Sequence, residues 1–244
     1  MKMISSRQNG LIKRIRALRD KKQRDVSCEY VVEGAKSVRD ALECGAEILI
    51  IAATVKGAAL MEDTAFPIEI LSDDVFSSVS EEVSPQGVLA IVKKPVPPRE
   101  ISGNTVFLDG VSDPANVGAI IRSAAAFGYK NVLIADGADA YANKAVRASM
   151  GGIFRVNVYS GTREEMLALI RLPIIVADMR GDTLNEVSVP KEHCLCIGNE
   201  AHGVSEKLKS LAVQKVSIPM GSGMESLNAA VSAGIIMYAL TFNK

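Results

Sequence analysis

Residues 105–128 read TVFLDGVSDPANVGAIIRSAAAFG, an apolar segment joined to a helical one through a short polar loop. The apolar half predicts a buried strand, and the small and apolar residues after Pro114 predict a helix that packs on most sides. Asn116 has the residue type that caps helices, so we expect it at the N-cap. Arg122 is the single charged residue of the helical half. It is expected either at the rim in a salt bridge or in a cleft, where its planar fork suits a phosphate.

The same alternation of strand and helix continues toward the C-terminus. Short apolar runs separated by longer helical segments indicate right-handed βαβ units, and therefore an α/β fold with a mostly parallel sheet. In such sheets ligands bind beyond the carboxyl ends of the strands, so the strand-to-helix junctions are the informative places. We expect strands at 131–136, 155–160, 173–179, 194–200 and 215–220, and helices at 143–152, 162–172, 205–212 and 226–240.

A smaller α/β region precedes this one. Apolar residues recur at helical spacing from Leu11 to Leu18, which predicts one basic amphipathic helix over residues 7–23. Three prolines within residues 95–98 exclude a helix or a central strand and indicate a stiff linker. Strands are expected at 29–34, 46–53, 67–72 and 87–94, with helices at 35–45, 55–65 and 73–83. The expected parts are a basic arm at 1–24, a small domain at 25–95, a linker at 96–103 and a larger domain at 104–244.

The composition is that of an ordinary globular protein. The chain has 244 residues, 48% of them hydrophobic and 23% charged, which excludes disordered, collagen-like and disulfide-scaffold classes. Its length allows one or two domains. Its four cysteines are too few for a disulfide framework. No apolar run reaches the ~20 residues of a membrane span, and the first residues lack the core of a secretory signal. We therefore expect a cytoplasmic protein.

A net charge of zero conceals an uneven distribution. Residues 1–24 carry nine basic residues and one acid, residues 25–100 carry six and fourteen, and residues 101–244 carry thirteen of each. Attraction to phosphates depends on a local patch rather than on the total charge. The N-terminal segment is therefore either an RNA-facing arm or a solvated helix face. On the first interpretation the RNA-binding residues are Lys13, Arg14, Arg16, Lys21 and Lys22.

A second junction, LCIGNEAHGVS at residues 195–205, leads from a strand into Gly198, Asn199 and Glu200. Gly198 permits close approach of the backbone to a ligand, and Gly203 permits a turn with positive φ. An ordinary βα loop would have the same composition, since Gly-Asn is a common turn.

A third junction, VSIPMGSGMESLNAAVSAGI at residues 216–235, joins the last strand to the last helix, which Ser226 or Ser222 is expected to cap. Gly221 and Gly223 match part of a dinucleotide-binding fingerprint. Ser226 stands where that fingerprint needs a third glycine, however, and the sequence ends before a ribose-binding acid could follow.

Metal and acyl-transfer chemistry have little support. Cys194 and Cys196 are one residue apart, so in a strand they face opposite sides and cannot grip one metal ion. His193 and His202 have no nucleophile motif beside them. We expect no metal site.

Taken in order, the three junctions resemble the three motifs of the SpoU (TrmH) family of RNA ribose 2′-O-methyltransferases. The first motif, an Asn and an Arg six residues later, matches Asn116 and Arg122. The second motif, a strand followed by Gly-Asn-Glu and a later Gly, matches residues 198–203. The resemblance covers residues 104–240. The third motif, Ile-Pro-Met followed by Ser-Leu-Asn, matches Ile218, Pro219, Met220, Ser226, Leu227 and Asn228.

This resemblance implies a fold and a set of partners. The C-terminal domain is expected to hold a deep trefoil knot in its parallel sheet and to form a homodimer. Residues 25–95 resemble the family's smaller substrate-binding domain, which has a ribosomal-protein-like α/β fold and favours ribosomal RNA as the substrate. S-adenosylmethionine is expected to bind in a bent shape, mainly through main-chain groups. The residues implied at this cofactor are Gly198, Asn199, Ile218, Met220, Leu227 and Asn228.

The resemblance also implies a catalytic group at Arg122. An uncharged 2′-hydroxyl is a poor nucleophile for in-line displacement at a sulfonium carbon, so the site must orient it and stabilise the loss of its proton. A guanidinium stays charged far above neutral pH, which makes it a poor base. We therefore expect Arg122 to clamp the adjacent phosphate and to stabilise the developing alkoxide.

Further side chains are expected to support Arg122. Glu200 and Asn199 would position the arginine and the nucleotide. Asn116 and Asn228 would hold the loops and polar edges of the substrate. Ser226 would hydrogen-bond near the hydroxyl. In relatives a Val-Ser pair often follows the last Asn, whereas this chain has two alanines, so one hydroxyl near the site is expected to be missing.

Two other functions remain open from the sequence. One is a non-catalytic RNA-binding protein of the same fold, such as a ribosome assembly factor, which would bind RNA without the cofactor. The other is a dinucleotide-dependent dehydrogenase, which would need the complete glycine fingerprint.

Overall fold

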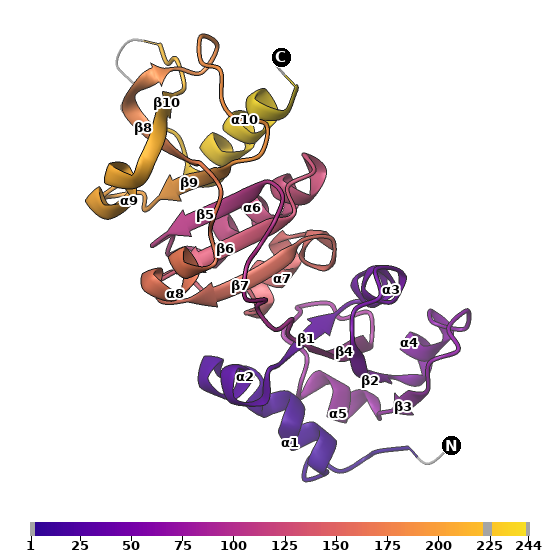
Figure 1. The fold of residues 1–244 in the computed structure, drawn as a ribbon. Helices are drawn as coiled ribbons and strands as arrows, with labels where there is room; N and C mark the ends of the chain where they lie inside the picture. Colours follow the sequence, from indigo (N-terminus) through magenta and orange to yellow (C-terminus); the bar gives the residue numbers. More distant parts are fainter. Residues whose placement is uncertain (1–2, 222–225, 243–244) are drawn as a thin grey trace. The chain divides into compact units, whose positions relative to one another are not determined.

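The computed structural model describes residues 3–221 and 226–242. The chain forms two compact units (Figure 1). The first contains the residues up to Lys94 together with Tyr141–Val146, and the second contains Pro95–Ala140 and the residues from Arg147 onward.

The first unit is built on a mixed sheet of four strands in the order β1-β4-β2-β3. Strand β4 is antiparallel to both β1 and β2, and only β2 and β3 are parallel. This unit is thus the smaller α/β domain expected before the linker, with a mixed sheet. The alternation of elements predicted each strand, but strand direction depends on how the chain returns after β3, which periodicity does not encode. The strands are β1 (Glu29–Glu33), β2 (Ile48–Ala53), β3 (Ile68–Ile70) and β4 (Val88–Lys93).

Two N-terminal helices replace the single one predicted over residues 7–23. Asn9 caps α1 by accepting a hydrogen bond from the Leu11 amide at 2.8 Å. Asp20 caps α2 by accepting from the Lys22 amide at 2.7 Å. An aspartate at this position starts a new helix because its side chain satisfies the free amides of the first turn. The helices of the unit are α1 (Gly10–Ala17), α2 (Lys21–Ser27), α3 (Ala35–Glu43), α4 (Val55–Ala59) and α5 (Asp73–Ser77).

The apolar face of α1 is part of the core of the first unit. Ile12, Ile15 and Leu18 are buried and pack with Leu71 and Phe76. The basic side chains of this helix therefore occupy the face that the core leaves to solvent.

The second unit contains a fully parallel sheet of six strands in the order β10-β8-β9-β5-β6-β7, which agrees with the expected class. Strand β9 lies between β8 and β5, so the winding of the sheet reverses there. Ligands of open parallel sheets bind at such a reversal, beyond the carboxyl ends of the strands. The strands are β5 (Thr105–Asp109), β6 (Asn131–Ala135), β7 (Asn157–Gly161), β8 (Ile174–Thr183), β9 (Cys194–Gly198) and β10 (Ala212–Ser217).

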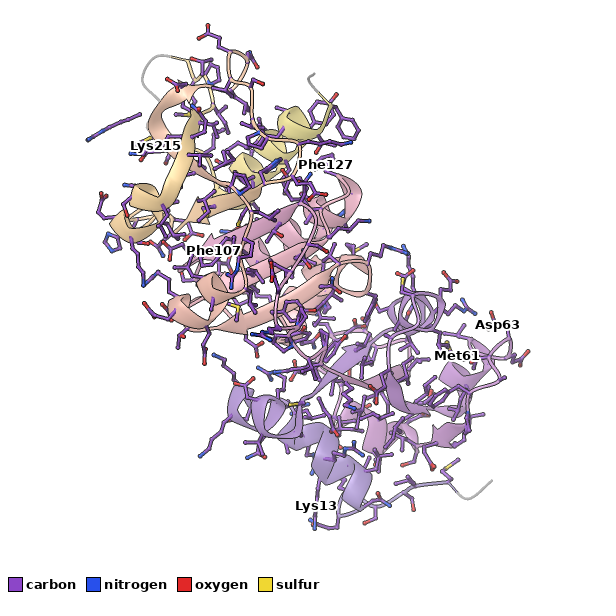
Figure 2. The ribbon with its side chains drawn as sticks, in the orientation of Figure 1. Lys13, Met61, Asp63, Phe107, Phe127 and Lys215 are labelled. Atoms are coloured by element: carbon purple, nitrogen blue, oxygen red, sulfur yellow. The ribbon has the colours of Figure 1, made fainter. Side chains whose placement is uncertain are left out.

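Helices cover the second sheet and complete its core. Phe107, labelled in Figure 2, is buried in that core with Leu133 and Cys196. Ile101 belongs to the same core, although it lies in the segment predicted as a linker. Among the described helices, none is long and apolar enough to span a membrane. The remaining elements of the chain are α6 (Pro114–Ala126), α7 (Asn143–Ala148), the short helix η1 (Gly152–Phe154), α8 (Arg163–Ala168), α9 (Glu206–Leu211) and α10 (Ala229–Phe242).

Candidate active site

The helix that follows β5 begins one turn earlier than its sequence indicates. Asp113, not Asn116, is the N-cap of α6, and its carboxylate accepts from the Ala115 amide at 3.0 Å. Pro114 occupies the first helical position, where a missing N–H costs nothing, and this places the cap immediately before it. The side chain of Asn116 is therefore available for contacts outside the helix.

Asn116 joins the three motifs. Its amide nitrogen donates to Glu200 Oε1 at 2.8 Å, and its amide oxygen accepts from Asn228 Nδ2 at 3.0 Å. Asn228 in turn caps α10, because its Oδ1 accepts from the Ala230 amide at 2.9 Å. The expected cap at Ser226 is wrong, and Ser222 and Gly223 lie outside the described residues. A chain of side-chain hydrogen bonds thus links one residue from each motif.

The loop after β9 is a closed turn. Asn199 donates from Nδ2 to the Gly110 carbonyl at 2.9 Å, and its main-chain oxygen accepts from the Gly203 amide at 2.8 Å. A Cβ on Gly198 would lie only 2.0 Å from the carbonyl carbon of Gly203. Residue 198 must therefore be glycine for the loop to close and to hold Glu200 at its tip.

Arg122 lies on a different face of α6 from Asn116. Its Cα lies 3.0 Å from the position of a Cβ on Gly152, next to η1. Ser123, seven residues after Asn116, instead faces α10 at Gly234. Arg122 is exposed and makes no hydrogen bond or ion pair within residues 3–221 and 226–242. The structure therefore joins Asn116, Glu200 and Asn228, and does not bring Arg122 into contact with them.

A cavity of about 120 Å³ opens beside the third motif. It is lined by four of the expected residues and by three polar side chains that the sequence analysis missed. Gly198, Asn199 and Asn228 are not among its lining residues. The expected residues are Ile218, Met220, Ser226 and Leu227, and the additional ones are Asp178, Ser217 and Ser232.

Asp178 supplies a carboxylate to this cavity. Strand β8 pairs with β9 only as far as Val176 and continues beside β10 to Thr183, so Asp178 lies in β8 just beyond the part that β9 flanks. The Arg180 amide, 2.9 Å away, and the nearby Lys209 ammonium hold the pKa of the carboxyl below its usual range. An acid two residues after the buried apolar run at 174–176 was the signal that could have identified it. Ser232, two residues after the position where a hydroxyl was expected to be missing, provides one to the cavity.

The lining of this cavity suits the chemical groups of S-adenosylmethionine. Its walls combine the apolar side chains of Ile218 and Leu227 with an ionised carboxylate and several hydroxyl groups. The apolar walls suit an adenine ring, and the polar groups suit the hydroxyl and ammonium donors of the cofactor.

The basic residues of the first unit fall into two groups. Lys13, labelled in Figure 2, is exposed, as are Lys21 and Lys22, and the three make no ion pair within the described chain. Arg14 is instead paired with Glu29 at 2.6 Å, and Arg16 donates to Ser78 Oγ at 2.8 Å.

Comparisons with known proteins agree with this site. The SpoU rRNA methylase family model matches residues 103–238, and the MRM3-like substrate-binding domain matches residues 9–90. The chain is 30% identical over 248 residues to the 23S rRNA (guanosine(2553)-2′-O)-methyltransferase RlmP of Bacillus subtilis, covering 98% of this chain and 99% of that protein.

Solved structures show the same likeness. The AdoMet-bound rRNA methyltransferase of Sinorhizobium meliloti matches with a TM-score of 0.86 at 27% identity, covering 98% of this chain and 97% of that one. The AdoMet complex of the SpoU methyltransferase AviRb of Streptomyces viridochromogenes matches with a TM-score of 0.83 at 26% identity, covering 97% and 98%. These matches favour methyl transfer over a non-catalytic RNA-binding protein or a dehydrogenase. The chain belongs to the SpoU rRNA methylase family and is an S-adenosylmethionine-dependent RNA 2′-O-methyltransferase.

Proposed function

We propose that Arg122 binds the phosphate beside the ribose that is methylated, and that Asn116, Glu200 and Asn228 shape the site around it. The observation that carries this proposal is a difference in hydrogen bonding between Arg122 and the other three side chains. The other three side chains bond to one another, whereas the guanidinium keeps its donors free within the described chain. A guanidinium with free donors binds phosphate through paired N–H groups and stabilises negative charge on the hydroxyl oxygen as its proton leaves.

The cavity beside the third motif holds the cofactor in this proposal. Bound S-adenosylmethionine supplies a methyl group on a positively charged sulfur. Ile218, Met220 and Leu227 would pack against its apolar parts, and Asp178 would accept hydrogen bonds from its polar groups. Gly198 and Asn199 shape the neighbouring loop rather than line the cavity. Ser226 lines the same cavity and would offer its hydroxyl to the ribose.

The proposed substrate is ribosomal RNA of the large subunit. Support comes from the likeness to RlmP, which extends over nearly the whole of both chains and includes the N-terminal region. Residues 25–95 would bind RNA together with the exposed lysines of the arm at 1–24, while 96–103 would link them to the methyltransferase domain at 104–244.

Further expected features remain proposals. A deep trefoil knot is supported by family membership and by the presence of Ile218, Met220, Ser226 and Leu227 at the cavity that β8 also lines. A homodimer is supported by an exposed apolar stripe on α10, since contiguous exposed apolar side chains mark interaction surfaces. A cytoplasmic site of action follows from a ribosomal RNA substrate. The stripe consists of Val231, Ile235, Tyr238 and Phe242.

Arg122→Ala tests the catalytic proposal. We expect kcat for methyl transfer to fall about 100-fold or more, since one preorganised donor to a developing oxyanion contributes that much. The Kd for S-adenosylmethionine, measured by calorimetry, should change less than twofold. Arg171→Ala is the matched control, because that guanidinium bonds only to nearby carbonyls of its own segment. Unchanged turnover by folded Arg122→Ala would remove this arginine from the mechanism. Mapping 2′-O-methylated positions in ribosomal RNA with and without the protein tests the substrate.

A further inference from the structure

A buried carboxylate stands at the carboxyl end of β5. Asp109 is only 2% exposed. Its Oδ1 accepts from Arg163 Nε at 2.6 Å, and its Oδ2 accepts from the Ser205 amide at 2.7 Å. Arg163 also contacts Asp136 at 3.3 Å. A buried charge needs such partners, since an unpaired carboxylate would be expensive to desolvate. The hydrogen bond from the carboxylate raises the pKa of the Arg163 guanidinium.

Gly110, the residue after Asp109, also makes a hydrogen bond to the loop that follows β9. The Gly110 carbonyl accepts from Asn199 Nδ2 at 2.9 Å. Gly110 thus holds the first residue of the loop 199–205, Asn199, and Asp109 holds its last residue, Ser205. Glu200, which bonds to Asn116, lies between these fastenings.

We propose that Asp109 is a positioning residue that fixes the loop 199–205, and through it the carboxylate of Glu200, for methyl transfer. This inference rests on the role given above to Asn116 and Glu200. Asp109 lies behind the loop, and its oxygens are already engaged by Arg163 and Ser205, so it acts without touching the substrate. Arg163 holds the carboxylate in place and compensates its charge. Loosening either end of a loop that carries an active-site group costs rate rather than affinity, because the group then spends less time in the productive geometry.

Asp109→Asn tests this role with little change of shape. An asparagine has one acceptor oxygen, so its amide must turn an NH₂ group toward either the Ser205 amide or the guanidinium, and one fastening is broken. We expect kcat to fall ~10- to 100-fold, with the Kd for S-adenosylmethionine and the KM for RNA within twofold of wild type. Hydrogen exchange should become faster at 199–205 and stay unchanged in β6 and β7. Asp136→Asn is the matched control, because this exposed residue contacts the same arginine, and asparagine tolerates its positive φ.

A double-mutant cycle separates an action through Glu200 from a general effect on folding. If Asp109 works by placing Glu200, the double variant Asp109→Asn with Glu200→Ala should be no slower than Glu200→Ala alone. Losses that multiply, or a wild-type kcat in Asp109→Asn, would overturn the inference. A failure of the proposed function is recognised separately, since Arg122→Ala would then keep full activity whatever Asp109 does.

Discussion

Asn228 donates a hydrogen bond of 3.0 Å to Asn116, although 112 residues separate them in the chain. The amide nitrogen of Asn116 in turn donates a hydrogen bond to Glu200. The bond pattern fixes the orientation of that amide, because a carboxylate can only accept and the Asn228 NH₂ group can only donate. Residues from the three family motifs are thus joined by two hydrogen bonds, and the side-chain types fix which group donates and which accepts.

Asn116→Asp should break this chain at one end. Two carboxylates would then face each other at hydrogen-bond distance, and we expect kcat to fall at least about tenfold because like charges repel. Adding Glu200→Gln restores a donor opposite Asp at 116 and should recover part of the loss. Steady-state methyl-transfer assays compare the single and double variants. Equal activity of the two would show that the Asn116–Glu200 bond is unimportant.

Gly198→Ala should disrupt the loop after β9. The new Cβ would meet main-chain atoms of Gly203 at 2.0 Å, where no side chain can move aside. We expect a loss of ~1–3 kcal/mol in the free energy of unfolding, together with weaker binding of S-adenosylmethionine. Thermal unfolding and calorimetry measure the two effects. Gly10→Ala, in open space at the start of α1, is the control and should leave both unchanged. A stable Gly198→Ala variant would contradict the geometry of the loop.

The strands and the three motifs could be predicted from the sequence, and the contacts among them could not. Apolar runs identified every strand of the second unit, because a parallel sheet buried on both faces needs such runs. The N-cap was misplaced at Asn116 because Asp113 and Asn116 are both good capping residues, and only the position of Pro114 decides between them. Asp109 and Asp178 were missed, since a single acid at the end of an apolar run is common, and the partners of Asp109 lie far away in sequence.

The helix at residues 10–17 shows the same limit of prediction from sequence. Amphipathic spacing correctly indicated that one face of residues 10–17 would be apolar, and that face is buried. The assumption that all its basic residues are equally free to bind RNA was less accurate. Arg14 and Arg16 are engaged with Glu29 and Ser78, which no local pattern encodes.

Replacing Lys13, Lys21 and Lys22 with alanine should therefore weaken RNA binding without affecting folding. Every lysine that touches a phosphate adds about 0.7–0.9 to the slope of log K against log salt, so the slope should become shallower by about 2–3 if all three do so. Arg14→Ala, which breaks the pair with Glu29, should instead lower the melting temperature. Filter binding over a range of salt concentrations measures the slope. An identical slope in the triple variant would mean that the lysines are only a solvated face.

Ile235→Asp should prevent self-association. Ile235 is 39% exposed within the apolar stripe of α10, and burying a carboxylate in an apolar interface is unfavourable. Sedimentation equilibrium should give about twice the chain mass of 26.0 kDa for the wild type and the single-chain mass for the variant. Val213→Asp, an exposed apolar residue on β10, is the control and should stay dimeric. A monomeric wild type would refute the proposed homodimer.

His193 should make the second unit sensitive to acid. Its ring is 1% exposed, with Nδ1 at 2.9 Å from the Pro190 carbonyl and Nε2 at 2.7 Å from the Tyr129 hydroxyl. A carbonyl can only accept, so Nδ1 carries the proton and Nε2 accepts from the tyrosine.

Burial lowers the pKa of His193 below its usual value, because the charged ring would lose its hydration. Above about pH 6.5 both the folded and the unfolded chain hold a neutral ring, and His193 makes no contribution to the pH dependence. As the pH falls below that value, the unfolded chain takes up the proton first, so the free energy of unfolding decreases until the lower pKa of the folded state is reached. Urea unfolding between pH 7.5 and 5 should therefore show a steeper loss for the wild type than for His193→Gln, by about 1.4 kcal/mol for each unit by which the pKa is lowered. All other titrating groups are common to both proteins, so parallel pH profiles would mean that the buried ring is protonated as easily as a free one.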